Sequence, residues 1–118
     1  MERRLTITVS ADVQARMKSL FKQAVESATY QGEFMDFARP ALFFSKLTDR
    51  RWSLLHTLQG AGEVPVRELA RRVGRDVKRV HEDAAALVAL GLLERTERGG
   101  VLCPFADIHV DMHLKKAA

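Results

Sequence analysis

The side chains best suited to chemistry in this 118-residue sequence are basic, and they gather between positions 67 and 79. The segment contains six basic residues against two acids, Glu68 and Asp76, and six minus two equals the whole formal net charge of +4. Arginine binds phosphate oxygens and guanine edges in a bidentate geometry, so the cluster indicates contact with a nucleic acid. A solvated helix face is the alternative. The basic residues are Arg67, Arg71, Arg72, Arg75, Lys78 and Arg79.

A second group of side chains suited to ligand binding lies near the C-terminus. Asp107, His109, Asp111 and His113 alternate with apolar residues and therefore share one face of a predicted strand. On a strand, same-face neighbours lie about 6.6 Å apart, and residues four apart about 13 Å. Because a metal ion binds its ligands at about 2.0–2.2 Å, we expect a polar strand face and no metal site.

The rest of the sequence narrows the class of protein. It contains no phosphate-binding glycine loop, carboxylate dyad or nucleophile motif, so we expect neither an enzyme nor a cofactor. Cys103 is the single cysteine, which leaves no internal disulfide and favours the reducing cytoplasm. The longest apolar runs are far shorter than the about 20 residues of a membrane span. With 47% apolar and 29% charged residues, the composition is typical of an ordered globular chain.

Capping residues and apolar spacing predict the elements that position the basic cluster. We expect a helix over 49–59, a short helix from position 65, a helix over about 76–90 and a β-hairpin over 92–105. The caps and terminators behind these bounds are Thr48, Pro65, Gly74, Asp76 and Gly91. Helix, short helix, tight turn, helix and hairpin is the order of a winged helix-turn-helix, whose third helix enters the major groove of DNA.

The helix over 76–90 has an apolar side and an opposite polar side. At 100° per residue, Arg75 and Glu82 project away from the core, with Lys78 and Arg79 on either side of them. Asp83 lies on the flank, where we expect an ion pair with Arg79 four residues earlier. The expected inward residues are Val77, Val80, Ala84, Leu87 and Val88.

The stretch 68–95 resembles a family of MarR-like winged helix-turn-helix transcriptional regulators of bacteria and archaea. The likeness rests on Gly74-Arg75-Asp76, on Val80-His81-Glu82-Asp83 and on a tail at 107–111, and it covers roughly residues 46–112. It implies a winged-helix fold and regulation of transcription. Some members of that family look like antitoxins encoded beside small toxins.

We therefore predict a repressor that binds double-stranded DNA, with contact residues of three kinds. Arg75, Lys78 and Arg79 face guanines or phosphates, and Glu82 accepts a hydrogen bond from a cytosine amino group. Arg67, Arg71 and Arg72 contact the phosphate backbone, although ion pairs of Arg71 and Arg72 with Glu68 or Glu82 are the alternative. Arg95 and Arg98 on the hairpin reach phosphate or the adjacent minor groove.

The first 45 residues are expected to form a strand-helix arm. A strand over 4–10 precedes an amphipathic helix, and residues 33–46 are predicted to be extended. Overall we predict an α+β fold, mainly α, with an arm over 1–45 and a winged helix over 46–118 that includes a C-terminal strand. The arm would make a homodimer or, in the alternative function, hold a partner protein such as a cognate toxin. Its expected contact residues are Leu5, Ile7, Val9, Met17 and Phe21.

Overall fold

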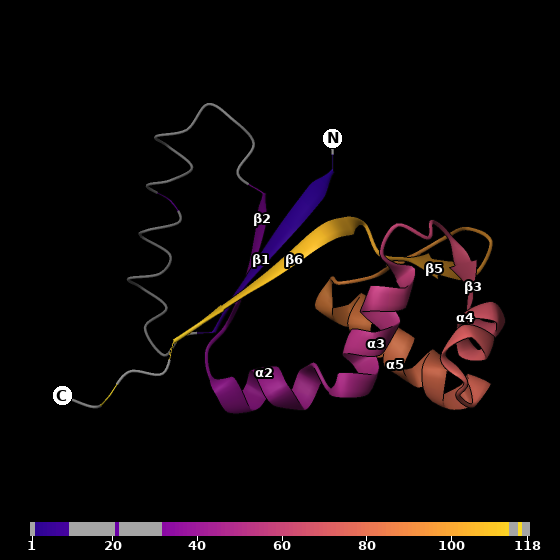
Figure 1. The fold of residues 1–118 in the computed structure, drawn as a ribbon, viewed down its shortest axis with the longest axis horizontal. Helices are drawn as coiled ribbons and strands as arrows, with labels where there is room; N and C mark the ends of the chain where they lie inside the picture. The colour runs from indigo at the N-terminus through magenta and orange to yellow at the C-terminus, as the bar shows by residue number, and fades with distance from the viewer. Residues whose placement is uncertain (1, 10–20, 22–31, 114–115, 117–118) are drawn as a thin grey trace. The chain divides into compact units, whose positions relative to one another are not determined.

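The computed structural model describes residues 2–9, 21, 32–113 and 116, and the chain divides into two compact units (Figure 1). The sheet unit comprises residues 1–45 and 107–118, and the helical unit comprises residues 46–106. The described residues form four helices and two three-stranded sheets, so the expected α+β class is confirmed. Within this part of the chain no helix has the length and apolarity that crossing a membrane requires.

The sheet unit is built on three strands in the order β2-β1-β6. They are β1 (Arg3–Val9), β2 (Glu33–Phe37) and β6 (Phe105–Met112), and β1 pairs with β2 in parallel from Leu5↔Glu33 to Val9↔Phe37. Alternation places Leu5, Ile7 and Val9 on one face, where all three are buried. The strands expected near both ends of the chain are thus confirmed.

The segment after β2 differs from the expected extended chain, because residues 40–46 form a helix, α2 (Pro40–Lys46). Pro40 is its first residue, where a missing N–H costs nothing and a fixed φ favours helix. Phe43 is buried and packs edge-to-face on Phe37, with ring centroids 5.4 Å apart. Phe44 remains 60% exposed, so only part of this aromatic segment enters a core.

The helical unit contains α3 (Asp49–Leu58), α4 (Val66–Val73) and α5 (Val77–Leu90), and local signals set their ends as expected. The Thr48 hydroxyl accepts a hydrogen bond from Arg51 N, and the Asp76 carboxylate accepts one from Arg79 N. Gly74 and Gly91 end α4 and α5 in the left-handed conformation, with φ of 67° and 89°. The fully buried leucines of these three helices are Leu54, Leu55, Leu58, Leu69 and Leu87, and Leu92 and Leu93 after α5 are buried with them.

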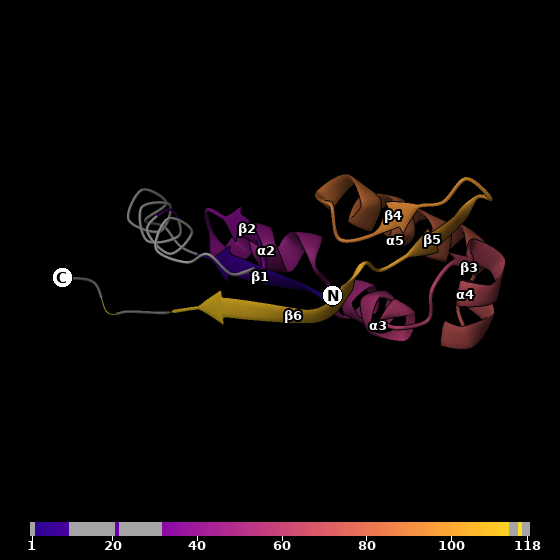
Figure 2. The same cartoon turned by 90° about the horizontal axis from the view of Figure 1, so that it is seen from above.

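A small antiparallel sheet in the order β3-β5-β4 completes the helical unit (Figure 2). Its strands are β3 (Val64–Pro65), β4 (Glu94–Arg95) and β5 (Gly100–Leu102). The expected hairpin over 92–105 is present, although its strands are shorter than predicted. Its turn is fixed by Gly99 N, which donates to Thr96 O at 3.0 Å, and by Gly100 N, which donates to the Thr96 hydroxyl at 2.9 Å.

Two sequence-based expectations are corrected here. The sequence predicts that the last strand belongs to the C-terminal domain over 46–118, but β6 pairs with β1, and residues 107–118 group with 1–45. Alternation predicts a strand without predicting which sheet it joins. Val77 is expected in the core, yet it is 43% exposed. It is the first residue of α5, and the buried side of this helix begins only at Val80 and continues through Ala84 and Leu87.

Leu87→Ala should lower the free energy of unfolding by about 2–5 kcal/mol, because Leu87 is fully buried and its truncation leaves a cavity. Val77→Ala on the same helix is the control, and its effect should stay within about 0.5 kcal/mol. Urea titration followed by circular dichroism measures both. Equal losses for the two variants would contradict the observed division of α5 into buried and exposed sides.

Candidate nucleic-acid interface

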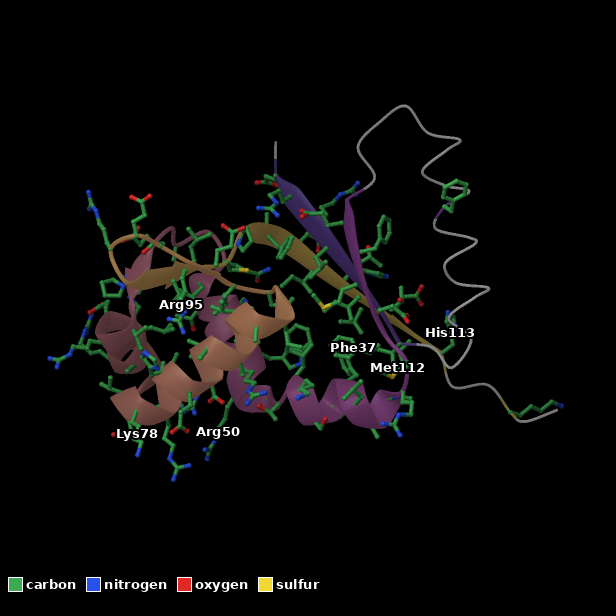
Figure 3. The ribbon with its side chains drawn as sticks, turned by 180° about the vertical axis from the view of Figure 1, so that it is seen from behind. Phe37, Arg50, Lys78, Arg95, Met112 and His113 are labelled. Carbon is green, nitrogen blue, oxygen red and sulfur yellow. The ribbon has the colours of Figure 1, made fainter. Side chains whose placement is uncertain are left out.

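The basic residues predicted to bind a nucleic acid come from α4, α5 and the hairpin. Arg67, Lys78 and Arg79 are exposed on the helices, and Arg95 and Arg98 are exposed on β4 and in the following turn. Figure 3 labels Lys78 and Arg95 and shows Lys78 extending away from the ribbon. These five side chains thus belong to one unit of the structure and are open to solvent.

Arg71 and Arg72 on α4 are bound to one carboxylate. Arg71 donates two hydrogen bonds to Glu68, from Nε at 2.9 Å and from Nη2, and Arg72 Nε donates a third at 3.1 Å. These hydrogen bonds lower the pKa of Glu68 from 4.5 to about 2, and those from Arg71 have the largest effect. Of the two partners that the sequence left open, the structure therefore selects Glu68. Both guanidiniums remain accessible, at 74% and 42% exposure, so phosphate contact stays open to them.

Arg75 does not lie where the helical projection placed it. Its side chain is only 19% exposed, and its Nη2 donates to Asp83 Oδ2 at 2.6 Å. The projection failed because Arg75 precedes Asp76, the extended N-cap of α5, so its side chain does not follow the helical period. We therefore remove Arg75 from the residues expected to touch DNA.

Arg51 on α3 completes this cluster, although the sequence pattern did not predict a role for it. Its Nε donates to Asp83 Oδ1 at 3.1 Å, and its Nη1 donates to the carbonyl of Lys46 at 2.8 Å. Asp83 thus pairs with Arg51 and Arg75, and the expected pair with Arg79 is wrong. The contact joins residues 32 positions apart, and no spacing pattern in the sequence predicts such a pair.

The charges of this three-residue cluster are largely withdrawn from water. Arg51, Asp83 and Arg75 have side-chain exposures of 22%, 18% and 19%. Burial alone would raise the pKa of Asp83, but the hydrogen bonds from Arg75 and Arg51 outweigh it, so the pKa lies below its usual value. With two guanidiniums and one carboxylate, the cluster retains a net positive charge beside the first turn of α5.

The exposed polar residues in the N-terminal half of α5 are then Lys78, Arg79, His81 and Glu82. Within the described part of the chain, neither Lys78 nor Arg79 makes a side-chain ion pair. The Arg79 backbone N–H donates to the N-cap Asp76 at 3.3 Å, which fixes its helical position without engaging the guanidinium. These side chains can therefore bind an external acceptor without first breaking an internal bond.

The residues expected to bind a second chain are placed differently. Leu5, Ile7 and Val9 are 3%, 0% and 3% exposed, so the chain itself covers them and they offer no open contact surface. Their role as the dimer or partner surface is corrected on this ground. Phe21 is 72% exposed, whereas Met17 lies outside the described residues. Across the described ranges, no three His, Cys, Asp or Glu side chains are placed to hold a metal ion.

Comparison with known protein families gives a match over the second half of the chain. The family model described as HVO_A0114 matches residues 46–110, more than half of the chain, and the chain belongs to that family. The matched range contains the whole helical unit and the first part of β6. No curated protein and no solved structure matches the chain.

Asp83→Asn should lower the free energy of unfolding by about 2–3 kcal/mol near neutral pH, since it leaves two largely buried guanidiniums facing each other without a counter-charge. The pKa of Asp83 is lowered in the folded chain, so its contribution is complete above the unfolded value of about 3.9 and is lost as the pH falls through the folded value. The difference between the two proteins in denaturant titrations should therefore shrink below about pH 4.

Glu68→Gln is the control for that titration. Although the pKa of Glu68 is also low, its ion pairs are solvated and should contribute little to stability. A pH-independent difference between the original chain and Asp83→Asn, or a larger loss for Glu68→Gln, would refute the structural role of the Asp83 cluster.

Proposed function

We propose that this member of the HVO_A0114 family is a sequence-specific regulator of transcription that binds double-stranded DNA through a winged helix-turn-helix over residues 46–105. The observation that carries the proposal is that Lys78 and Arg79 on the first turn of α5 are exposed and have no ion-pair partner among the described residues. In this proposal α5 is the recognition helix, and α4 with the turn at 74–76 is the first half of the motif.

The proposed contacts are of two kinds, contacts to base edges and contacts to the phosphate backbone. Lys78 and Arg79 donate to guanine O6 and N7 or to phosphate, and Glu82 accepts from a cytosine amino group. Arg67, Arg71 and Arg72 donate to the phosphate backbone, which orients the protein without reading sequence. The hairpin β4–β5 acts as the wing, with Arg95 and Arg98 on phosphate or in the adjacent minor groove.

The internal pairing of other basic residues supports this division. Arg51 and Arg75 are bound to Asp83, so they act as positioning residues: Arg51 ties α5 to α3, and Arg75 ties it to the turn before it. A recognition helix with a fixed base loses less conformational freedom on binding, which favours affinity. The likeness of residues 68–95 to MarR-like regulators supports the same function, and a repressor acting as a homodimer on two half-sites is the arrangement we propose.

A second candidate function is the binding of a partner protein, such as a cognate toxin, by the sheet unit. The exposure of Phe44 (60%), Phe34 (39%) and Phe21 (72%) favours it, because large apolar side chains open to water commonly mark interaction surfaces. The two functions are compatible in an antitoxin that also represses its own operon.

DNA binding by the full chain should depend steeply on salt. If a dimer neutralises about six to ten phosphates, the logarithm of the binding constant should fall against the logarithm of salt concentration with a slope of about −5 to −9. The double variant Lys78→Ala with Arg79→Ala should weaken binding and flatten this slope, whereas Arg39→Ala, an exposed arginine of the sheet unit, should leave both unchanged. Fluorescence anisotropy with labelled duplexes measures them. A salt-independent signal, or equal losses for both variants, would count against α5 as the interface.

Single substitutions should separate base contacts from backbone contacts. Arg79→Ala should cost about 1–3 kcal/mol on the preferred site and relax the preference at one base pair per half-site. Arg98→Ala should weaken binding to all sequences about equally, because a phosphate contact carries no sequence information. Competition titrations against single-base-pair variants of the site distinguish the two patterns. If Arg98→Ala changed base preference and Arg79→Ala did not, the roles of α5 and the hairpin would be exchanged.

A further inference from the structure

The side of β6 that faces away from β1 is an edge of the sheet. In the order β2-β1-β6, β6 has β1 on one side and no strand on the other within the described residues, and Figures 1 and 2 show it running along β1. Ile108, Val110 and Met112 on this strand are only partly buried. An eight-residue edge strand without proline or lysine, carrying partly exposed apolar side chains, is a template for pairing with another strand.

The side chains of β6 are arranged to pair with themselves. Asp107, His109 and Asp111 of β6, together with His113, which directly follows the strand, alternate acid and imidazole along one side. His113 Nε2 lies 3.1 Å from Asp111 Oδ1, and Asp107 and His109 line one shallow cleft with Arg4 and Thr6 of β1, so each neighbouring pair lies on a common side. Ile108, Val110 and Met112 take the alternate positions.

We propose that β6 pairs antiparallel with β6 of a second copy of this chain about a two-fold axis at Val110. Residues whose numbers add to 220 then lie opposite each other. His109 faces Asp111 of the second copy, and Asp107 faces its His113, so every acid on this side meets an imidazole. On the alternate side Val110 meets itself and Ile108 meets Met112. Cross-strand pairs of this kind stabilise a sheet.

Other registers lack this complementarity. An axis at His109 would oppose Asp107 to Asp111 and His109 to itself, and an axis at Asp111 would oppose that carboxylate to its own copy. Like charges directly opposite each other destabilise a sheet. Axes at Ile108 or Met112 leave some of the four residues without a complementary partner. An imidazole N–H can donate to a carboxylate that already holds another bond, so the Asp111–His113 contact within one strand does not prevent the pairing.

The choice of a second copy as the occupant rests on the proposed function as well as on this charge pattern, since a repressor reading two half-sites needs two chains. The pairing would join two three-stranded sheets into one of six strands. It would also give residues 107–113 a role that neither the helical core nor DNA binding assigns to them.

An exchange of charges tests the register in the full chain. His109→Asp places carboxylates opposite each other at two symmetric points and should raise the dimer dissociation constant about tenfold or more. Combining His109→Asp with Asp111→His restores an acid opposite an imidazole and should return the constant to within about threefold of the original. Sedimentation equilibrium measures all three chains. A concentration-independent monomer of 13.3 kDa, or a double variant as weak as the single one, overturns the proposal.

Disulfide trapping reports the same register by distance. Val110→Cys should give a covalent dimer under mild oxidation, because this residue opposes its own copy, whereas the original chain with its buried Cys103 should not. Asp107→Cys and His113→Cys should each fail alone, since equivalent residues lie about 20 Å apart, and should cross-link when the two chains are mixed. Cross-linking of Asp107→Cys with itself, or none at Val110→Cys, overturns the register.

Failure of this inference and failure of the proposed function give different results. Introducing Lys78→Ala and Arg79→Ala into the Val110→Cys chain should weaken DNA binding and leave the cross-link unchanged. If the original chain binds no DNA while Val110→Cys still cross-links, only the proposed function fails. If DNA is bound and no cross-link forms, only the pairing of β6 fails.

Discussion

A single carboxylate between two guanidiniums holds the helical unit in the form on which everything else depends. Asp83 on α5 accepts hydrogen bonds from Arg51 on α3 and from Arg75 in the turn before α5. Withdrawing three charges from water is costly, and the arrangement is stable only because each oxygen of the carboxylate has a donor. The contact therefore ties α5 to α3 and to the turn before it, and with this it fixes the direction in which the first turn of α5 presents its side chains.

Seven arginine and lysine side chains of the helical unit carry the same charge but have different roles, because their partners and their exposure to water differ. Arg51 and Arg75 are structural because their partner is buried with them. Arg71 and Arg72 share an exposed carboxylate that solvent and a competing phosphate can replace. In the part of the chain that the structure describes, Lys78 and Arg79 have no such partner, and they face water, as does Arg67. A DNA-binding surface follows from this division more directly than from the net charge, which counts all of them alike.

Local signals in the sequence predicted local structure well. The hydroxyl of Thr48, the carboxylate of Asp76 and the glycines at 74 and 91 act on the nearest backbone groups, and each helix end lies where they predict. The extended segment expected around Pro40 is wrong, because proline is favoured at the first position of a helix. The positions of Arg75, Arg51 and β6 depend on contacts between distant segments, and no periodicity within one segment specifies them. The burial of Leu5, Ile7 and Val9 within the chain likewise depends on contacts with segments that are distant in the sequence.

The central claim is that the exposed turn of α5 reads a DNA sequence, and selection of binding sites from a pool of random duplexes tests it most directly. The full chain is used to capture DNA over repeated rounds, and the bound molecules are sequenced. Our account predicts enrichment of one motif with inverted-repeat symmetry, because two chains related by a two-fold axis present the same helix to each half-site. A captured pool with the same sequence composition as the input after several rounds would contradict it.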